Sequence, residues 1–468
     1  MVFSSVIFLV YFLPLVLFCY FIAPDRWRNT ILLLFSLFFY AWGEPKYVFL
    51  MLFSIAMNYF FGIFIDKFQD RQRKQKLILV LAVIGNLLIL GFFKYFNFMI
   101  ENVNILLGTS FAIEPIPLPI GISFFTFQAI SYLVDVYRKD GEVQRNILNI
   151  SLYISLFPQL MAGPIVRYQT VAEQLKKRFI TLDLFTEGIQ RFIMGLAKKV
   201  LLANTFGSIA DDIFAMDPSN LSTGTAWIGI IAYTLQIYFD FSGYSDMAIG
   251  LGLMFGFRFL ENFNYPYISK SISEFWRRWH ISLGHWFRDY VYIPLGGNRV
   301  ARWKIYRNLL IVWALTGFWH GASWTFLAWG TYYGIIIMIE RMGLEQWMTR
   351  LWSPIRHVYV LFIVMIGWVF FRADHFSYAY AYLQTMFGFN GTGILDTYTV
   401  YYLSTNGVMI AIGVIIATPV YHLIRKSAVN LPISLRATCL YIVCFFLLSQ
   451  TILKLVNETY NPFLYFRF

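Results

Sequence analysis

One histidine lies where an ionisable side chain is costly. His320 is part of the run from Leu309 to Ile339, which contains no Asp, Glu, Lys or Arg. A charge-free run of that length is typical of a membrane-spanning segment, and an ionisable residue inside a membrane is by default a candidate functional residue. Imidazole titrates near neutral pH, so His320 could take a proton from a hydroxyl that attacks an activated carbonyl. The run therefore predicts acid–base-assisted group transfer.

A second histidine, His280, lies in an aromatic-rich segment from Ser269 to Gly297. Its aromatic and apolar residues recur at helical spacing, which predicts one amphipathic helix at the membrane interface. His280 shares the apolar face with Trp276 and Leu283, and it fits either a catalytic partner of His320 or a hydrogen-bonded structural group. The opposite, polar stripe consists of Arg278, Ser282, His285 and Asp289. We therefore expect His285 to be solvated.

Two carboxylates interrupt the apolar stretch from Ala226 to Phe257. Asp240 and Asp246 are too costly in hydrocarbon to face lipid, so they must pair with cations, line a cavity or be protonated. One interpretation makes them structural partners of arginines such as Arg258 or Arg288. The other makes them part of a proton or substrate pathway.

The composition places these residues in a polytopic membrane protein. Of the 468 residues, 59% are hydrophobic and only 13% are charged. At about 20 residues per span, the apolar runs predict an all-α fold of roughly ten to twelve transmembrane helices, some tilted or broken. The apolar N-terminus lacks the basic region of a signal peptide, so we interpret it as the first span. We expect one domain, with N-terminal spans in 1–110, a catalytic core in 111–340 and C-terminal spans in 341–468.

The basic residues predict the orientation in the membrane. The first loop carries Arg26 and Arg28, the second carries only one basic residue, Lys46, and the third carries five between Lys67 and Lys76. This pattern places the odd-numbered loops in the cytoplasm and the N-terminus outside. We assign other basic groups, including Lys198-Lys199, to such loops as well. Topology and anionic lipids explain most of the net charge of +12, and the remainder could attract an anionic acyl donor.

Glycine spacing and missing motifs narrow the chemistry. Gly317/Gly321 and Gly330/Gly334 have the spacing that lets helices approach closely, and glycines beside His320 would also let the helix bend or open. The sequence contains no P-loop, dinucleotide, zincin or nucleophile-elbow motif. The three cysteines have no ligand spacing, so neither a disulfide framework nor a metal site is expected. No feature points to nucleic acid.

Several motifs, in order along most of the chain, resemble the membrane-bound O-acyltransferase family. The match is best with the bacterial branch that contains alginate O-acetylation proteins, peptidoglycan O-acetyltransferases and teichoic acid D-alanyl transferases. The motifs are Pro117-Leu-Pro-Ile-Gly-Ile-Ser-Phe-Phe-Thr-Phe-Gln128, Phe157-Pro-Gln-Leu-Met-Ala-Gly-Pro-Ile-Val-Arg-Tyr168, Asp240-Phe-Ser-Gly-Tyr-Ser-Asp246, Phe275-Trp-Arg-Arg-Trp-His280, Tyr292-Ile-Pro-Leu-Gly-Gly-Asn-Arg299 and Gly317-Phe-Trp-His-Gly-Ala322.

The resemblance implies roles for three residues. His320 matches the family's catalytic histidine and His280 its second histidine, whereas His285 departs from the family pattern. The C-terminal run from Asn461 to Phe468 resembles a terminal motif of this branch, in which the tyrosine, here Tyr465, is proposed to carry the acyl group. On the residues alone, an aromatic interfacial anchor is the alternative. The family fold implies tilted helices ringed around a central tunnel, with interfacial helices.

The leading hypothesis is an acetyltransferase of the cytoplasmic membrane. It would pass acetyl from cytoplasmic acetyl-CoA across the bilayer for O-acetylation of a cell-envelope or exported polysaccharide, with His320, His280 and Tyr465 as site residues. No bound cofactor is expected, and a separate extracytoplasmic acyltransferase would complete the reaction. One alternative uses a carrier-protein thioester, as in D-alanyl transfer. Another is a proton-coupled transporter or flippase using Asp240, Asp246 and His320.

Overall fold

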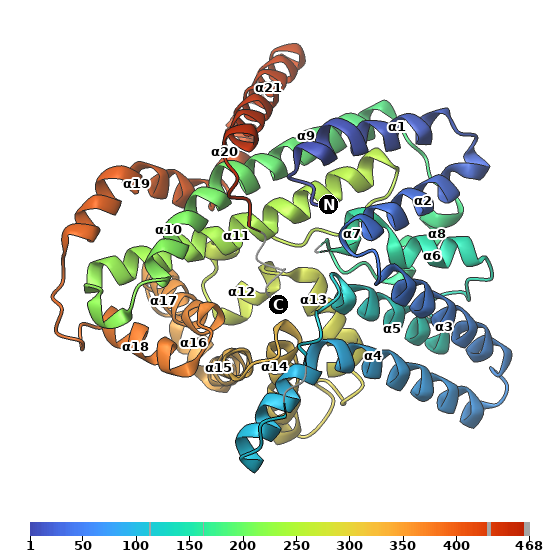
Figure 1. Cartoon of the computed structure of the whole chain (residues 1–468), viewed down its shortest axis with the longest axis horizontal. Coiled ribbons are helices and arrows are strands. Elements are labelled where there is room, and N and C mark those ends of the chain that lie inside the picture. The colour runs from blue at the N-terminus through green and yellow to red at the C-terminus, as the bar shows by residue number, and fades with distance from the viewer. Residues whose placement is uncertain (112–113, 162, 428–431, 463–468) are drawn as a thin grey trace. The chain divides into compact units, whose positions relative to one another are not determined.

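The protein folds into helices joined by short connections (Figure 1). The computed structural model describes residues 1–111, 114–161, 163–427 and 432–462. Every regular element in these ranges is a helix, which confirms the predicted all-α class. The chain divides into two compact units, of which the first comprises residues 1–192 and 245–260 and the second comprises residues 193–244 and 261–468.

The first unit is built from the N-terminal helices. They are α1 (Leu13–Ile22), α2 (Asp25–Gly43), α3 (Val48–Lys67), α4 (Gln72–Leu107), α5 (Ile122–Arg138), α6 (Ile147–Ser155), α7 (Phe157–Leu160), α8 (Tyr168–Lys176) and most of α9 (Leu182–Ala197). α3, α4 and α5 pack against one another. Between α3 and α4, the buried amides of Asn58 and Asn86 donate to each other at 3.1 and 2.8 Å. This exchange satisfies two polar groups that would be costly in an apolar interior.

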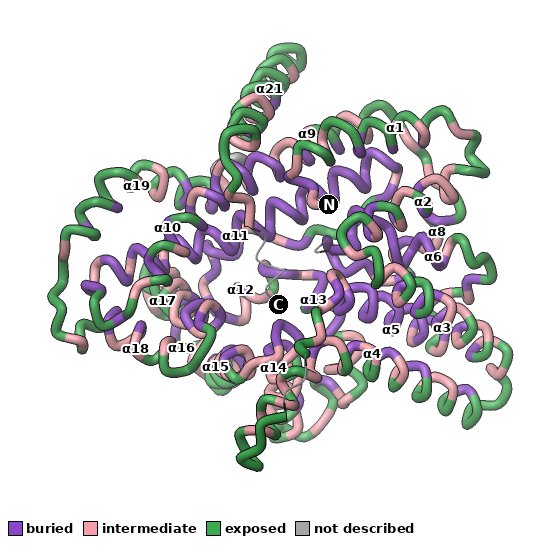
Figure 2. Tube along the Cα trace, in the orientation of Figure 1, coloured by how far each residue is buried: buried purple, intermediate pink, exposed green. Residues whose placement is uncertain are grey.

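The second unit contains both candidate histidines. Its helices are α10 (Asn204–Phe214), the first part of α11 (Thr223–Met254), α12 (Ile272–Arg278), α13 (Ile281–Phe287), α14 (Arg302–His320), α15 (Trp324–Ile339), α16 (Glu345–Met348), α17 (Ser353–Arg372), α18 (Phe376–Met386), α19 (Thr397–Ile416), α20 (Val420–Ser427) and α21 (Ile433–Asn457). α15 packs against α12, α14 and α17. α11 is almost entirely buried along its length (Figure 2).

Six helical stretches in the described part of the chain are long and apolar enough to cross a membrane. They are Val48–Lys67, Gln72–Leu107, Leu182–Phe214, Ser353–Arg372, Thr397–Ile416 and Ile433–Asn457. In α4, α19 and α21, at most 17% of the most apolar window is buried, and green dominates these helices in Figure 2. Such exposed apolar surface fits contact with lipid. The polytopic class is confirmed, whereas the count of ten to twelve spans stays a prediction.

Candidate active site

His320 is the last residue of α14, where the charge-free run breaks. The run from Leu309 to Ile339 is not one continuous helix, contrary to its simplest interpretation as a single span. α14 ends at His320, Gly321 is extended, and the side chain of Ser323 caps α15 by accepting from the backbone N–H of Phe326 at 3.3 Å. The break confirms that the glycines beside His320 open the helix, and it places the imidazole at a helix end.

The glycines hold α14 and α15 together at close range. A Cβ on Gly330 would lie 2.3 Å from the carbonyl oxygen of Trp313 and 2.9 Å from the Cα of Gly317. A Cβ on Gly321 would lie 2.3 Å from the ring of Phe326. No side chain fits at these positions without a shift of the neighbouring atoms. The predicted packing role of the GxxxG pairs is therefore confirmed.

Aromatic rings enclose His320, which is only 4% exposed. Its ring centroid lies 5.0 Å from that of Trp329 on α15 and 5.3 Å from that of Phe371 at the end of α17. Trp329 in turn packs against Trp276 and Trp368, with centroids 5.5 and 6.2 Å away. An apolar wall of this kind keeps water away from an imidazole and fixes its orientation.

His280 lies in a break as well, between α12 and α13. The sequence pattern predicts one amphipathic helix here, but α12 ends at Arg278 and α13 begins at Ile281. His280 has a φ of +46°, which is left-handed backbone and unusual for a residue with a side chain. Such backbone is often retained at functional sites. His280 is buried, as predicted, but this local turn and not the periodicity of a continuous helix places it there.

The turn also buries Ser282, which the helical pattern placed on the polar stripe. The Oδ1 atom of Asn262 accepts from the backbone N–H and the hydroxyl of Ser282, at 3.2 and 2.9 Å, and lies 3.2 Å from Nδ1 of His280. Because the Ser282 N–H can only donate, Oδ1 is the acceptor and Nδ1 of His280 donates to it. The lone pair of His280 is then on Nε2. His285 is partly exposed, in line with its assignment to the polar side.

Burial keeps His280 neutral. Desolvation lowers the pKa of this imidazole to about 3, far below the ordinary value of 6.5. His280 lies outside the six candidate membrane helices. At neutral pH it can accept a hydrogen bond through Nε2 or orient a neighbour, but it carries no charge. This environment fits the orienting role better than that of a cation.

The ring of Trp319 contacts both histidines. Its centroid lies 6.1 Å from that of His280 and 4.9 Å from that of His320. The ring of Phe241, on α11, packs edge to face on His280, with the two ring centroids 4.6 Å apart. The structure therefore brings two of the three predicted site residues together in one aromatic cluster. The third, Tyr465, lies outside the described residues.

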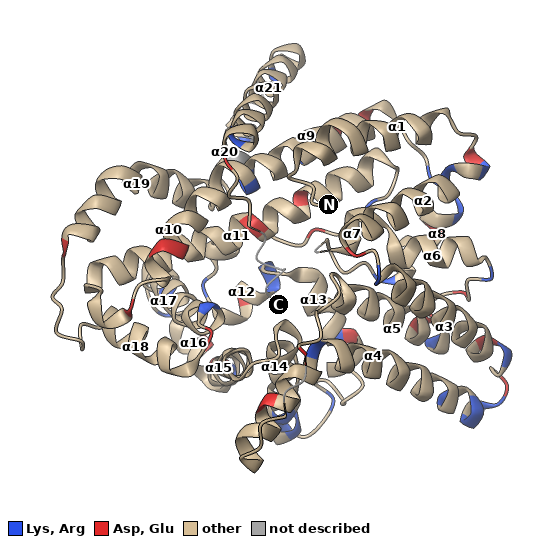
Figure 3. Cartoon of the chain, in the orientation of Figure 1, with Lys and Arg blue, Asp and Glu red and all other residues tan. Residues whose placement is uncertain are grey.

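The two carboxylates of α11 pair with cations, as the structural interpretation predicts. Asp240 forms an ion pair with Lys199 at 2.6 Å, and both side chains are at most 3% exposed. In the first unit, Asp246 pairs with Arg191 at 2.6 Å. The named candidates, Arg258 and Arg288, are not the partners that these ion pairs use. Figure 3 shows acidic residues on α11 within otherwise uncharged ribbon.

Lys199 is a residue for which the sequence prediction is wrong. The pattern of basic residues predicts a loop here, but Lys199 lies in a π-helical turn, Lys198–Ala203, between α9 and α10, and is 2% exposed. The available signal was the apolar sequence on both sides of Lys198-Lys199, which is typical of a buried segment. A lysine so placed requires a fixed counter-charge, and Asp240 provides it.

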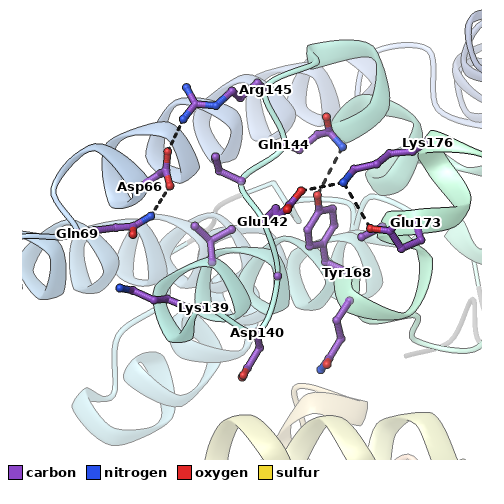
Figure 4. A pocket seen from close by; sticks show the side chains of 15 residues that line it. Asp66, Gln69, Lys139, Asp140, Glu142, Gln144, Arg145, Tyr168, Glu173 and Lys176 are labelled. Atoms are coloured by element: carbon purple, nitrogen blue, oxygen red, sulfur yellow. Dashed lines mark hydrogen bonds and ion pairs between the residues drawn. The ribbon is translucent and has the colours of Figure 1, made fainter.

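A polar cavity of about 780 Å³ lies in the first unit, and Figure 4 shows its charged lining. Arg145 pairs with Asp66 at 2.7 Å, and Lys176 pairs with Glu142 at 2.8 Å. None of the predicted site residues lines this cavity. Its acidic and basic groups largely neutralise each other, so it does not resemble an anion site.

The sequence comparisons identify the class of protein. Residues 137–372 match the sequence model of the membrane-bound O-acyltransferase (MBOAT) family. The chain belongs to this family and is an O-acyltransferase with a polytopic membrane fold. The matched region includes both candidate histidines.

Individual relatives narrow the class. The chain is 41% identical to a probable alginate O-acetylase of Azotobacter vinelandii, with all of both chains covered. It is 37% identical to a peptidoglycan O-acetyltransferase of Helicobacter pylori, over 84% of this chain and 81% of the relative. A teichoic acid D-alanyltransferase of Bacillus subtilis is 28% identical over 55% of this chain and 70% of the relative. The two O-acetylating relatives are thus more similar than the D-alanylating one.

Proposed function

We propose that the protein transfers acetyl from acetyl-CoA, on the cytoplasmic side of the cytoplasmic membrane, for O-acetylation of a cell-envelope or exported polysaccharide. The observation that carries this proposal is the pairing of His320 with His280 around Trp319 in a chain whose full-length relative is a probable alginate O-acetylase. A polysaccharide acceptor follows from the names of the O-acetylating relatives.

His320 acts as general base in this scheme. It takes the proton from an attacking hydroxyl while the new C–O bond forms at the thioester carbonyl and the C–S bond breaks. The proton then passes from His320 to the departing CoA thiolate, so that free thiol leaves. His280, neutral and held by Asn262, orients the neighbouring groups through Nε2. The aromatic wall excludes water and so disfavours hydrolysis of the thioester.

Tyr465 is the proposed first acceptor, and it lies outside the described residues. A phenol of pKa about 10 is easier to deprotonate than a sugar hydroxyl, and its acetyl ester remains activated for onward transfer. Onward transfer to the polymer would be completed by a separate extracytoplasmic acyltransferase. The acetyl group then leaves the tyrosine oxygen for a sugar oxygen, and the phenol regains its proton.

The test uses purified protein and acetyl-CoA labelled in the acetyl group. The proposal predicts release of CoA and label on the peptide that contains Tyr465. If the purified protein does not react with acetyl-CoA but accepts D-alanyl from a charged carrier protein, the proposed donor is wrong and the D-alanyl alternative is supported. The similarity to D-alanyltransferases is the observation that keeps that alternative in the test.

A further inference from the structure

The end of the described chain is bound to the same unit that holds the histidines. Beyond α21, residues 458–462 form no regular element, and they contact α10 and the π-helical turn before it. The side-chain amide of Asn204 donates to the backbone oxygen of Tyr460 at 3.2 Å and to Oδ1 of Asn461 at 3.3 Å. Nζ of Lys199 donates to the carbonyl oxygen of Pro462 and, at 3.0 Å, to Oδ1 of Asn204.

A second set of contacts fixes the tyrosine of this segment. The hydroxyl of Tyr460 donates to Oδ2 of Asp211 at 2.6 Å, and Arg372 pairs with Oδ1 of the same carboxylate at 2.8 Å. Gly207 leaves room for the tyrosine, because a Cβ there would lie 2.9 Å from the Tyr460 hydroxyl. Lys454, in the last turn of α21, donates to the hydroxyl of Thr205 at 2.6 Å. One face of α10 therefore binds the chain end at successive positions.

In both sets of contacts, an ion pair connects the binding residue to a side chain that is next in sequence to a ring packed on one of the histidines. Arg372, which holds Asp211, follows Phe371, whose ring packs on His320. Asp240, which pairs with Lys199, precedes Phe241, whose ring packs on His280. The chain end thus binds Asp211 and Lys199, whose ion-pair partners Arg372 and Asp240 are next in sequence to the rings that cover the candidate catalytic pair.

We propose that Lys199, Asn204 and Asp211 form a docking site for the chain's own segment Glu458–Pro462, and that this docking positions Tyr465 for acylation. The inference rests on the proposed function, because it assigns the docking a role in delivering Tyr465. Lys199, Asn204 and Asp211 are positioning residues in this account. Asp240 fixes the ammonium group of Lys199, which explains why a buried ion pair is retained beside the site.

Asn204→Ala is the most informative variant. It removes both hydrogen bonds to residues 460 and 461, and the bond that Asn204 accepts from Lys199, but leaves the buried charges of Lys199 and Asp240 paired with each other. Tyr460→Phe removes only the contact with Asp211. Asn457→Ala is the matched control, because it makes the same side-chain change at an exposed residue of the last turn of α21.

Two measurements on purified full-length protein separate docking from catalysis. The first is backbone hydrogen exchange of residues 458–461, because Pro462 has no amide proton, and the second is labelling of the Tyr465 peptide by acetyl-CoA. Since two hydrogen bonds to the docked segment are lost, Asn204→Ala should raise the exchange rate and lower the labelling rate by roughly tenfold or more. Tyr460→Phe should act in the same direction with a smaller effect, and Asn457→Ala should match the wild type.

The outcomes distinguish this inference from the proposed function. Unchanged exchange in both Asn204→Ala and Tyr460→Phe would overturn the docking site. Faster exchange with unchanged labelling would overturn its positioning role. In a Tyr465→Phe background, Asn204→Ala should not change the residual release of CoA to water, and a further loss there would assign Asn204 to the folding of the histidine site instead. Wild-type polymer acetylation by Tyr465→Phe itself would refute the relay, whatever the exchange experiment shows.

Discussion

At the scale of single residues, environment separates the two histidines. His320 ends a helix inside an aromatic wall, and His280 occupies a strained turn where Asn262 fixes its tautomer. Both are buried, and Nδ1 of His280 is held by the amide oxygen of Asn262. This contact fits the orienting role of His280 in the proposed scheme, in which His320 moves the proton.

The low pKa of His280 gives a pH prediction. An unfolded chain protonates this imidazole below pH 6.5, whereas the folded protein resists protonation down to about pH 3. Stability associated with neutral His280 is therefore complete above pH 6.5 and is lost as the pH falls toward 3. His280→Gln should flatten this part of the stability–pH curve, measured by thermal unfolding in detergent. An unchanged slope between pH 6.5 and 4 would show that His280 is not buried in neutral form.

Tyr465→Phe tests the acyl relay by removing a single hydroxyl group. The ring survives, so an anchor would tolerate the change, whereas an acyl carrier would lose its only acceptor atom. We expect acetylation of the envelope polymer to disappear in cells that carry only this variant. Normal polymer acetylation would favour the anchor and leave the role of His320 intact.

At the scale of elements, helix breaks make the site. The α14–α15 hairpin turns at His320 because Gly321 and the capping residue Ser323 stop and restart the helix. The close contact of Gly317 with Gly330 keeps the hairpin tight and brings Trp329 against the imidazole. The site therefore depends on small residues that themselves perform no chemistry.

Gly330→Ala tests the hairpin. The added methyl group would press on the Trp313 carbonyl, and overpacking of this kind costs about 1–3 kcal/mol, more than the gain of up to about 1 kcal/mol from better helix propensity. We expect a lower unfolding temperature and weaker acyl transfer. Gly407→Ala in α19 is the matched control, because a Cβ there meets nothing within 4 Å and should be neutral or stabilising. Equal stability of the two variants would contradict the close contact.

The sequence predicts much of this site, but not its local geometry. The absence of charge around His320 and the spacing of the glycines are visible along the chain, and the glycines predict the close packing and the helix break that the structure shows. The turn at His280 is not visible, because helical periodicity continues through it and the stop depends on Asn262. The partners of Asp240 and Asp246 also escape sequence reasoning, because they are set by how helices pack in space. In the sequence, the adjacent pair Lys198-Lys199 is typical of a basic loop, and only the structure shows that Lys199 is buried.

At the scale of the whole molecule, hydropathy is that of a membrane protein, and the distribution of charge predicts its orientation. α3 is one of the six candidate spans, and it connects the weakly charged loop at Lys46 with the basic loop that begins at Lys67. The positive-inside rule then places Lys46 outside and the basic loop in the cytoplasm. An acyl donor in the cytoplasm requires a binding surface on the cytoplasmic side, where the basic loop is predicted to lie.

Cysteine labelling of intact cells checks this orientation. In a background without the three native cysteines, an impermeant thiol reagent should label Lys46→Cys and miss Gln72→Cys. Both positions are exposed, Lys46 just before α3 and Gln72 at the start of α4, so accessibility within the protein does not bias the comparison. The reverse pattern would invert the topology and move the donor to the outer face.

The central claim is that His320 is the base for transfer from acetyl-CoA. The most direct measurement compares CoA release and protein labelling by purified wild type and His320→Ala under identical conditions. General acid–base catalysis contributes roughly 10²–10⁴-fold, so the variant should be slower by at least about 100-fold while inserting and folding normally. An equal rate of CoA release and labelling in the two proteins would contradict the account.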